Sequence, residues 1–258
     1  MVRRNTPSRR IAVKSAEEQE IMRRAGRIVA LTLHKVGEAI RPGMTTGEID
    51  ALAEKTIRSL GAIPAFLGYN GFPATACISI NEQVVHGIPG LRLVKAGDLV
   101  KVDLGAIVDG WYADAAYTFP VGEVSELAKR LMECGQGALT AGVEEARAGK
   151  RVRDIGAAVQ RYAESRGFSV VRDLCGHGIG RRLHEEPQIP NYPTRGGNIE
   201  LQVGMALAIE PMVNAEWPDV LQESDGWTFV TADASLSVHY EHTVLVQPDG
   251  PEIITSLR

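Results

Sequence analysis

The alternation of apolar and polar residues is clearest over residues 99–119, where two runs of β-branched and aromatic residues are joined by Asp109 and Gly110. An Asp-Gly pair between such runs predicts a two-residue hairpin loop, because both loop residues must take positive φ. Asp103 and Asp114 then lie on one face of the hairpin as diagonal neighbours, with Cβ atoms roughly 7–8 Å apart. This spacing suits two carboxylates that flank a pair of metal ions about 3.5–4 Å apart. The hairpin alone leaves another interpretation open, in which Asp114 is a solvated strand residue and Asp103 an acceptor beside a turn.

Four helices are predicted from a capping residue before the first turn, a glycine after the last turn, or both. The expected helices run from the Ser15 cap to about residue 40, from the Thr45 cap to Gly61, from the Ser125 cap to about residue 146, and over roughly residues 152–166 before Gly167. Most of the remaining chain is expected to form strands.

A faint internal repeat relates the first and second pairs of helices. A shift of 106 residues aligns Gly43 with Gly149, Ile49 with Ile155, Ala51 with Ala157 and Gly61 with Gly167. Such a repeat predicts two similar halves around a pseudo-two-fold axis, with a site in the central cleft that receives side chains from both.

Three further candidate metal ligands follow the hairpin. His177 lies between glycines in residues 175–180, where the backbone can pass close to other groups, and the spacing is not that of a nucleotide-binding loop. Glu210 ends the apolar run of residues 205–209, and Glu241 lies in the middle of a strand-like run, residues 237–246. A carboxylate in a buried strand is costly unless it is paired or bound to metal.

These residues together favour a hydrolytic metal site. Any one of the acids, taken alone, is more often a surface or ion-paired residue than a ligand. Four carboxylates with one imidazole, however, suit Mn, Fe, Co or Zn, whereas a structural zinc site uses thiolates.

The composition is that of an ordinary globular protein, with 258 residues, 44% hydrophobic residues and a formal charge of −4. This length predicts one domain of α/β or α+β type. We expect residues 1–10, which contain Arg3, Arg4, Arg9 and Arg10, to be a basic disordered arm, and residues 11–258 to be a single catalytic domain. No stretch approaches the ~20 apolar residues that a membrane span needs, and no block of charge suggests a channel for DNA.

The cysteines indicate a reducing compartment. Cys77, Cys134 and Cys175 are an odd number without a Cys-x-x-Cys spacing, which predicts neither a disulfide framework nor a zinc ribbon. The cytoplasm is the simplest location.

Seven segments of the chain resemble the methionine aminopeptidases, in the order found in that family and over nearly everything from residue 11 onwards. They are residues 77–89 (CISINEQVVHGIP), 102–105 (VDLG), 112–116 (YADAA), 175–181 (CGHGIGR), 183–187 (LHEEP), 209–212 (IEPM) and 240–244 (YEHTV). The resemblance implies an α+β pita-bread fold, with pseudo-two-fold α/β halves around a central antiparallel sheet. It also implies two divalent metal ions and removal of the initiator methionine from nascent chains. Glu210 follows His177 by only 33 positions, which resembles the short class (type I) of the family.

The resemblance also implies a role for each site residue. Asp103, Asp114 and Glu241 would bind or bridge both metals, and His177 and Glu210 would complete one of them. A metal-bridging water or hydroxide would attack the first peptide bond, with Glu210 carrying its proton. His184 would stabilise the oxyanion and His86 would orient the scissile amide, tasks that suit histidines titrating near neutrality.

A pocket for the methionine side chain is implied as well. Its expected lining is Tyr69, Phe72, Cys77, Leu183 and Trp227. Aromatic faces and a thiol suit a polarizable thioether. Phe72 and Leu183 depart from the tyrosine and phenylalanine of many members, and Trp227 is expected to begin a strand, where core packing is the alternative role.

Two other functions remain open on the sequence alone. Proline-specific aminopeptidases and prolidases share the fold, and some pita-bread proteins have lost their metals and act as binding modules. The substrate expected here is the N-terminal methionine of nascent polypeptides. We further expect a monomer, a transient ribosome contact through the basic arm, and neither a DNA nor a membrane partner.

Overall fold

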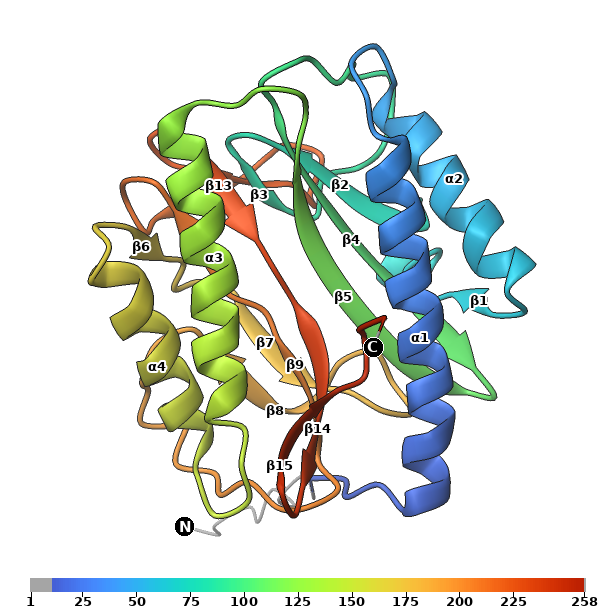
Figure 1. Cartoon of the computed structure of the whole chain (residues 1–258), viewed down its shortest axis with the longest axis vertical. Helices are drawn as coiled ribbons and strands as arrows, with labels where there is room; N and C mark the ends of the chain where they lie inside the picture. The colour runs from blue at the N-terminus through green and yellow to red at the C-terminus, as the bar shows by residue number, and fades with distance from the viewer. Residues whose placement is uncertain (1–10, 258) are drawn as a thin grey trace, which may run out of the picture.

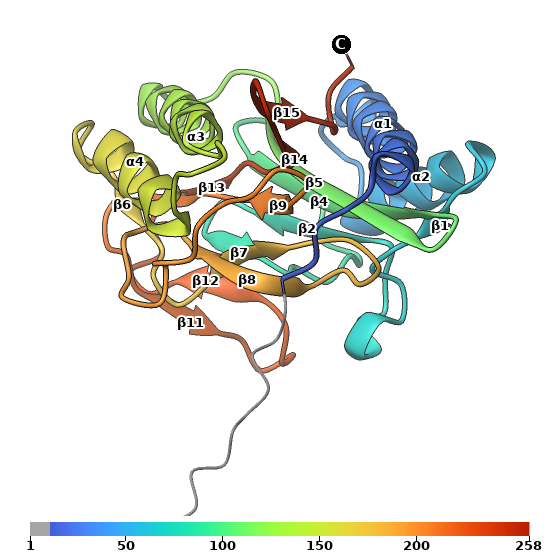
Figure 2. The same ribbon diagram turned by 90° about the horizontal axis from the view of Figure 1, so that it is seen from below.

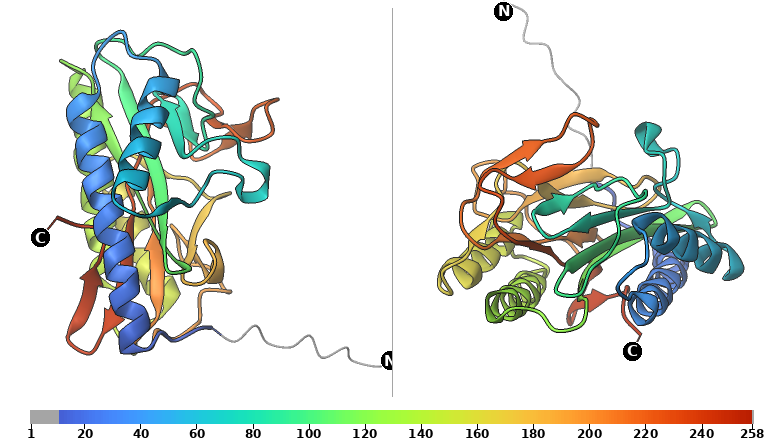
Figure 3. Two further views of the ribbon diagram at one scale, coloured as in Figure 1. Left: turned by 90° about the vertical axis from the view of Figure 1, so that its right-hand side faces the viewer. Right: turned by 90° about the horizontal axis from the view of Figure 1, so that it is seen from above.

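The computed structural model describes residues 11–257, which form two similar halves of helices packed on antiparallel strands (Figure 1). The expected basic arm, residues 1–10, lies outside the described residues. The four helices lie on one side of the molecule and most strands on the other (Figure 2 and Figure 3). Within residues 11–257, no helix combines the length and hydropathy needed to cross a bilayer.

The elements of the first half precede those of the second along the chain. The first half contains α1 (Ala16–Ala39), α2 (Thr46–Ser59), β1 (Ile63–Pro64), the 3-10 turn η1 (Tyr69–Gly71), β2 (Ala76–Ile80), β3 (Gln83–Val85), β4 (Leu99–Val108) and β5 (Trp111–Pro120). The second half contains α3 (Glu126–Glu144), α4 (Val152–Glu164), β6 (Ser169–Val170), β7 (Cys175–Gly178), β8 (Glu185–Pro190), β9 (Ala206–Ile209), β10 (Met212–Asn214), β11 (Val220–Gln222), β12 (Phe229–Thr231), β13 (Ser237–His239), β14 (His242–Gln247) and β15 (Gly250–Ile253).

The strands form four sheets, and every ladder between the described strands is antiparallel. One sheet has the order β1-β4-β2, with β5 also paired to β4, and a five-stranded sheet has the order β15-β14-β9-β7-β8. Two three-stranded sheets, β13-β10-β6 and β11-β12-β3, complete the layer. Because β3 comes from the first half and β12 from the second, the halves share a sheet beside the site. The predicted α+β arrangement is confirmed.

The predicted β4–β5 hairpin is confirmed in register and loop type. Val108 pairs with Trp111, and Asp103 pairs with Ala116. Asp109 and Gly110 form the loop with φ of 49° and 76°, as a type I′ turn requires. Asp103 and Asp114 therefore lie on the same face.

The four predicted helices are also confirmed, and capping side chains set the starts of three of them. Ser15 and Thr45 each accept the backbone N–H three residues on, from Glu18 and Glu48, and each glutamate accepts the N–H of its cap residue. Ser125 caps α3 through the N–H of Ala128. Local sequence is therefore sufficient to place these helix starts.

The internal repeat is confirmed by matching backbone hydrogen bonds. Gly43 N donates to Val94 O at 2.9 Å, and Gly149 N donates to Leu201 O at 2.9 Å. Two further pairs of bonds match, namely Thr46 to Arg92 with Val152 to Ile199, and Gly47 to Gly90 with Arg153 to Gly197. Gly43 and Gly149 also share a left-handed conformation, with φ of 90° and 84°. In both halves, therefore, the start of the second helix is hydrogen-bonded to a distant loop in the same way.

The expectation of one strand over residues 237–246 is wrong. β13 ends at His239 and pairs with β10, whereas β14 begins at His242 and pairs with β9 and β15. Between them Glu241 N donates to Ala116 O of β5 at 2.9 Å. The chain changes sheets at this point, and the break brings Glu241 against the hairpin that carries Asp103 and Asp114.

A buried lysine, Lys101, connects the start of β13 to the turn between β2 and β3, which precedes His86. Lys101 is 1% exposed, and its Nζ donates to Asn81 O at 2.7 Å and to Ser237 O at 2.8 Å. Burial lowers the pKa of its ammonium to about 7. The two hydrogen bonds offset the cost of burying the amine, and they fix the β2–β3 turn against β13.

We expect Lys101→Met to lower the free energy of unfolding by roughly 1–3 kcal/mol, because a buried carbonyl loses its donor. Urea denaturation of the metal-free protein measures the change. Lys95→Met is the control, since Lys95 is exposed and its replacement should leave the denaturation midpoint unchanged. An equal loss in both variants would contradict a structural role for the buried ammonium.

Candidate metal centre

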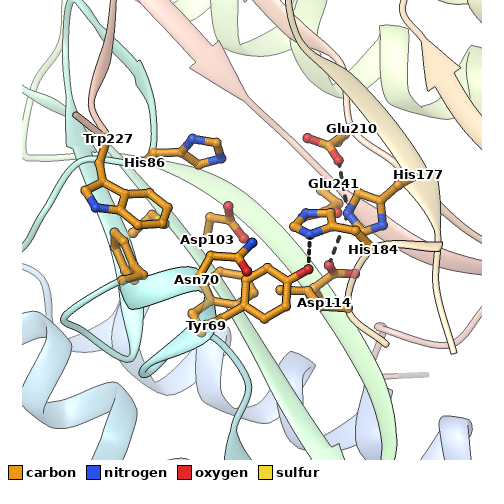
Figure 4. A pocket seen from close by; sticks show the side chains of 14 residues that line it. Tyr69, Asn70, His86, Asp103, Asp114, His177, His184, Glu210, Trp227 and Glu241 are labelled. Atoms are coloured by element: carbon orange, nitrogen blue, oxygen red, sulfur yellow. Dashed lines mark hydrogen bonds and ion pairs between the residues drawn. The ribbon is translucent and has the colours of Figure 1, made fainter. Parts of the chain in front are cut away.

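A single pocket receives every side chain that the sequence analysis proposed for the site (Figure 4). Its lining consists of Phe66, Tyr69, Asn70, Phe72, Cys77, His86, Asp103, Asp114, His177, Leu183, His184, Glu210, Trp227 and Glu241. Phe66 and Asn70 were not predicted. Their neighbours in the sequence carry no charge pattern that would have marked them.

The candidate metal ligands come from three strands and two strand junctions. Asp103 and Asp114 lie on β4 and β5, His177 lies on β7, Glu210 follows β9, and Glu241 lies between β13 and β14. One ligand atom each from Asp114, His177 and Glu241 lies within 4.8 Å of the other two. His177 Nε2 also lies 3.5 Å from Glu210 Oε1. Five candidate ligands that span 139 positions of the sequence thus lie in one pocket.

The glycines beside His177 allow β7 to lie between two close neighbours. A Cβ at Gly176 would overlap the carbonyl oxygen of Ala208, and a Cβ at Gly178 would overlap that of Glu186. The expectation that these glycines permit close backbone approach is confirmed. His177 is therefore held on a strand with little freedom to shift.

Without a cation, burial and mutual repulsion disfavour the charged form of the carboxylates in this pocket. Burial raises the pKa of Asp103, Glu210 and Glu241 well above the ordinary range, and the neighbouring carboxylates raise each one further. Burial also raises the pKa of Asp114 to about 6. Among the described residues, Asp103 Oδ1 is buried without a hydrogen-bond partner.

This donor set fits divalent metal ions. Buried, mutually repelling carboxylates with an orphaned oxygen gain a partner when a cation binds. Oxygen ligands with one imidazole match first-row divalent ions rather than a thiolate-type zinc site.

The two candidate catalytic histidines lie on opposite sides of the pocket. His184 Nδ1 lies 2.8 Å from Tyr69 Oη, and its ring centroid lies 4.3 Å from that of His177. His86 has a left-handed backbone with φ of 59°, and its ring meets Phe229 edge to face at 5.9 Å. Neither histidine belongs to the compact ligand group formed by Asp114, His177 and Glu241.

The expectation that these histidines titrate near neutrality is wrong. Burial lowers the pKa of His86 and of His184 to about 4, and the neighbouring His177 lowers that of His184 further. Both imidazoles are therefore neutral at pH 7 and act there as hydrogen-bonding groups.

Two residues that the sequence analysis missed, Thr243 and His239, lie against candidate ligands. Thr243 Oγ1 lies 3.0 Å from Asp114 Oδ1 and accepts the Asp114 N–H at 3.0 Å. His239 is 1% exposed, and its Nε2 lies 3.6 Å from Glu210 Oε2. Thr243 is two residues from Glu241, a spacing that can signal a shared strand face. No local signal marks His239.

The expected methionine pocket forms an apolar wall opposite the ligands. Phe72 and Trp227 meet edge to face with centroids 5.1 Å apart, and Leu183 and Cys77 are buried. Burial raises the pKa of the Cys77 thiol well above its usual value, so the thiol stays protonated. A neutral, polarizable wall of this kind suits a thioether.

The expectation that Trp227 begins a strand is wrong, because β12 starts at Phe229. Asp225 Oδ1 accepts the N–H groups of Trp227 and Thr228, each at 2.8 Å. These bonds form an Asx turn that competes with the strand ladder. The indole is thus presented by a turn and not by a strand.

Comparison with known proteins places these features in a family. The profile of metallopeptidase family M24 matches residues 20–248. The chain is 48% identical to a methionine aminopeptidase of Clostridium perfringens over 96% of its own length and 100% of that protein. It is 47% identical to methionine aminopeptidase 1 of Bacillus subtilis, with 95% and 99% covered.

Solved structures give the same grouping. The methionine aminopeptidase of Thermotoga maritima superposes with a TM-score of 0.93 at 44% identity, over 96% of this chain and 100% of that one. A prolidase of Pyrococcus furiosus superposes with a TM-score of 0.78 at 26% identity, over 95% of this chain and 66% of that one.

Proposed function

This chain belongs to metallopeptidase family M24 and has the pita-bread fold, and on that premise we propose that it removes the N-terminal methionine from nascent proteins and peptides. One observation carries the proposal. Five ligand-type side chains lie in a pocket that also presents Phe72 and Trp227 to a substrate side chain. A metallopeptidase whose pocket is lined by aromatic and other apolar side chains is suited to an N-terminal methionine.

Use of divalent metal follows from the family, and we propose two ions. Asp103, Asp114 and Glu241 would bind or bridge both, while His177 and Glu210 would complete one of them. Co, Mn, Fe and Zn are the candidates, because carboxylate-rich sites bind several first-row ions. When bound, such ions supply an activated water nucleophile and polarise the scissile carbonyl.

The protein's own residues would orient the substrate and move protons. Tyr69 Oη is placed to donate to His184 Nδ1, which leaves His184 Nε2 as the donor toward a negatively charged carbonyl oxygen. Across the pocket, His86 would orient the scissile amide. Glu210 would accept the proton of the attacking water and pass it to the leaving amine.

The cellular setting is part of the same proposal. We propose a cytoplasmic monomer that meets nascent chains at the ribosome, with contact through the basic residues 1–10. The free state of Cys77, Cys134 and Cys175 agrees with a reducing compartment.

Proline-specific hydrolysis is the second candidate. It is supported by the shared fold of the prolidase relative, and it is disfavoured by the higher identity to methionine aminopeptidases. A non-catalytic binding role is disfavoured because the full set of ligand-type side chains lies in one pocket.

We expect the metal-stripped protein to release methionine from Met-Ala-Ser only after Mn, Co, Fe or Zn is added under anaerobic conditions. Leu-Ala-Ser and Ala-Pro-Ala are the comparison substrates, and chelation should remove the activity again. Product analysis by liquid chromatography measures each rate and ranks the metals in one series.

The other outcomes separate the candidates. Preferred cleavage of Ala-Pro-Ala would establish the proline-specific function in place of the proposed one. Metal binding without cleavage of any of the three peptides would favour the binding role.

A further inference from the structure

The segment before α1 is fastened to the loop that carries His184 by a buried ion pair. Lys14 Nζ lies 3.1 Å from Glu185 Oε2, and the two side chains are 2% and 9% exposed. In Figure 2 the blue segment that leads into α1 passes beside β8, the strand that Glu185 begins. The pair joins positions 171 residues apart.

Lys14 is itself held at several points. Its backbone N–H donates to Gly204 O at 2.8 Å, and its carbonyl accepts Gln19 Nε2 at 2.9 Å. Its ammonium also donates to Ala12 O at 3.2 Å. The ammonium therefore approaches Glu185 from an anchored backbone.

On the other side of the pair, Glu185 shapes the loop itself. Its second oxygen, Oε1, accepts the N–H of Arg182 at 3.1 Å. Gly180 N donates to Arg182 O at 3.1 Å, and Gly180 O accepts the N–H of Tyr112 at 2.9 Å. The tip between Arg182 and Glu185 consists of only two residues, Leu183 and His184, and both line the active-site pocket.

Gly180 shows how closely the pair and the loop fit. A Cβ added there would lie 2.7 Å from Lys14 Cε and 2.9 Å from each carboxylate oxygen of Glu185. The ion pair thus packs against the start of the loop as well as its end.

We propose that Lys14 is a positioning residue, which acts through Glu185 to hold the Leu183–His184 tip in the active-site pocket. The proposal rests on the proposed aminopeptidase function. A buried ion pair contributes little net stability, because apolar residues of similar volume often replace such pairs without loss of stability. Its value here is the fixed direction of two carboxylate oxygens, one toward Lys14 and one toward the loop backbone.

The test uses Lys14→Met and the double variant Lys14→Met/Glu185→Met, each in the full chain. The single change leaves a buried carboxylate without its cation, and the double change replaces both charges by apolar chains of similar length. We expect kcat on Met-Ala-Ser to fall about 10–100-fold in both, because a displacement of about 1 Å at a positioned group can cost that much.

Three further measurements distinguish positioning from general destabilisation. The melting temperature should fall in the single variant and recover in the double variant, while kcat stays low in both. The preference for Met-Ala-Ser over Leu-Ala-Ser should also fall, because Leu183 lines the side-chain pocket. Metal affinity by calorimetry should match the wild type, because no candidate ligand lies in the tip.

Glu185→Gln gives a variant that keeps the shape of the side chain. Its one amide oxygen can accept from Lys14 or from Arg182 but not from both in the original geometry, so we expect a smaller loss of kcat. Lys129→Met is the matched control. It removes an exposed ion pair with Glu126 of α3 at 2.6 Å, outside the lining of the active-site pocket, and should leave kcat and selectivity unchanged.

Recovery of both kcat and melting temperature in the double variant would show that the ion pair only stabilises the fold, and it would overturn the proposal. Normal kcat in Lys14→Met and Glu185→Gln, with an active wild type, would do the same. If the wild-type protein itself released no methionine, the proposed function would fail first, and the two failures are thereby distinguished.

Discussion

Replacing Asp114 with asparagine is expected to abolish methionine release together with most of the metal binding. Asp114 is 2% exposed and lies within 4.8 Å of ligand atoms of both His177 and Glu241. An amide keeps the size of the side chain and an acceptor for Thr243, but it removes the negative charge that attracts the cations. Metal content after dialysis and calorimetric titration with Mn measure binding, and Met-Ala-Ser hydrolysis measures activity.

Asp109→Asn is the matched control for this prediction. It makes the same change on the same hairpin, at an exposed loop residue that pairs with Arg24 on the surface. Asparagine is also well suited to the loop conformation, so metal content and activity should stay normal. The metal-free Asp114→Asn protein should be no less stable than the metal-free wild type, since burial already disfavours the Asp114 charge. Near-normal turnover in Asp114→Asn would refute the metal centre described above.

The parts of the site that the sequence predicted depend on short-range rules. The Asp109 and Gly110 loop sets the register of β4 and β5, and the register alone places Asp103 and Asp114 on one face. The starts of α1 and α2 follow from capping residues within four positions. Each of these features is decided by neighbours along the chain, so no knowledge of the fold is needed.

The features that the sequence did not predict depend on contacts between distant residues. The break at Glu241 arises because the chain leaves one sheet and meets Ala116 of another. His239 approaches Glu210 across 29 positions of the sequence, and Lys14 approaches Glu185 across 171 positions. No periodicity in either segment signals such a partner.

The histidine pKa values illustrate the same limit. His86 and His184 were expected to titrate near neutrality on the basis of residue type alone. In the structure both are desolvated, and burial lowers the pKa of each to about 4. Burial depends on the whole pocket, which comprises residues from 66 to 241. Residue identity therefore predicted the presence of the imidazoles but not their charge.

Replacing His184 with alanine is expected to lower kcat by ~10²-fold or more, as for loss of an oxyanion-stabilising donor, while metal content is unchanged. The separation of the two effects follows from geometry. His184 contacts the His177 ring and Tyr69 Oη, but it is not part of the compact ligand group of Asp114, His177 and Glu241. Steady-state kinetics on Met-Ala-Ser and metal analysis of the same samples provide the test.

Tyr69→Phe then tests how His184 works. If the tyrosine hydroxyl donates to Nδ1 and so keeps the proton on Nε2, its removal should lower kcat less than loss of the imidazole does, and the two losses should not add in the double variant. His34→Ala on the exposed face of α1 is the control and should change neither quantity. Loss of metal in His184→Ala would instead make His184 a ligand. Additive losses would separate Tyr69 from His184, and the tyrosine would then act only as a wall of the methionine pocket.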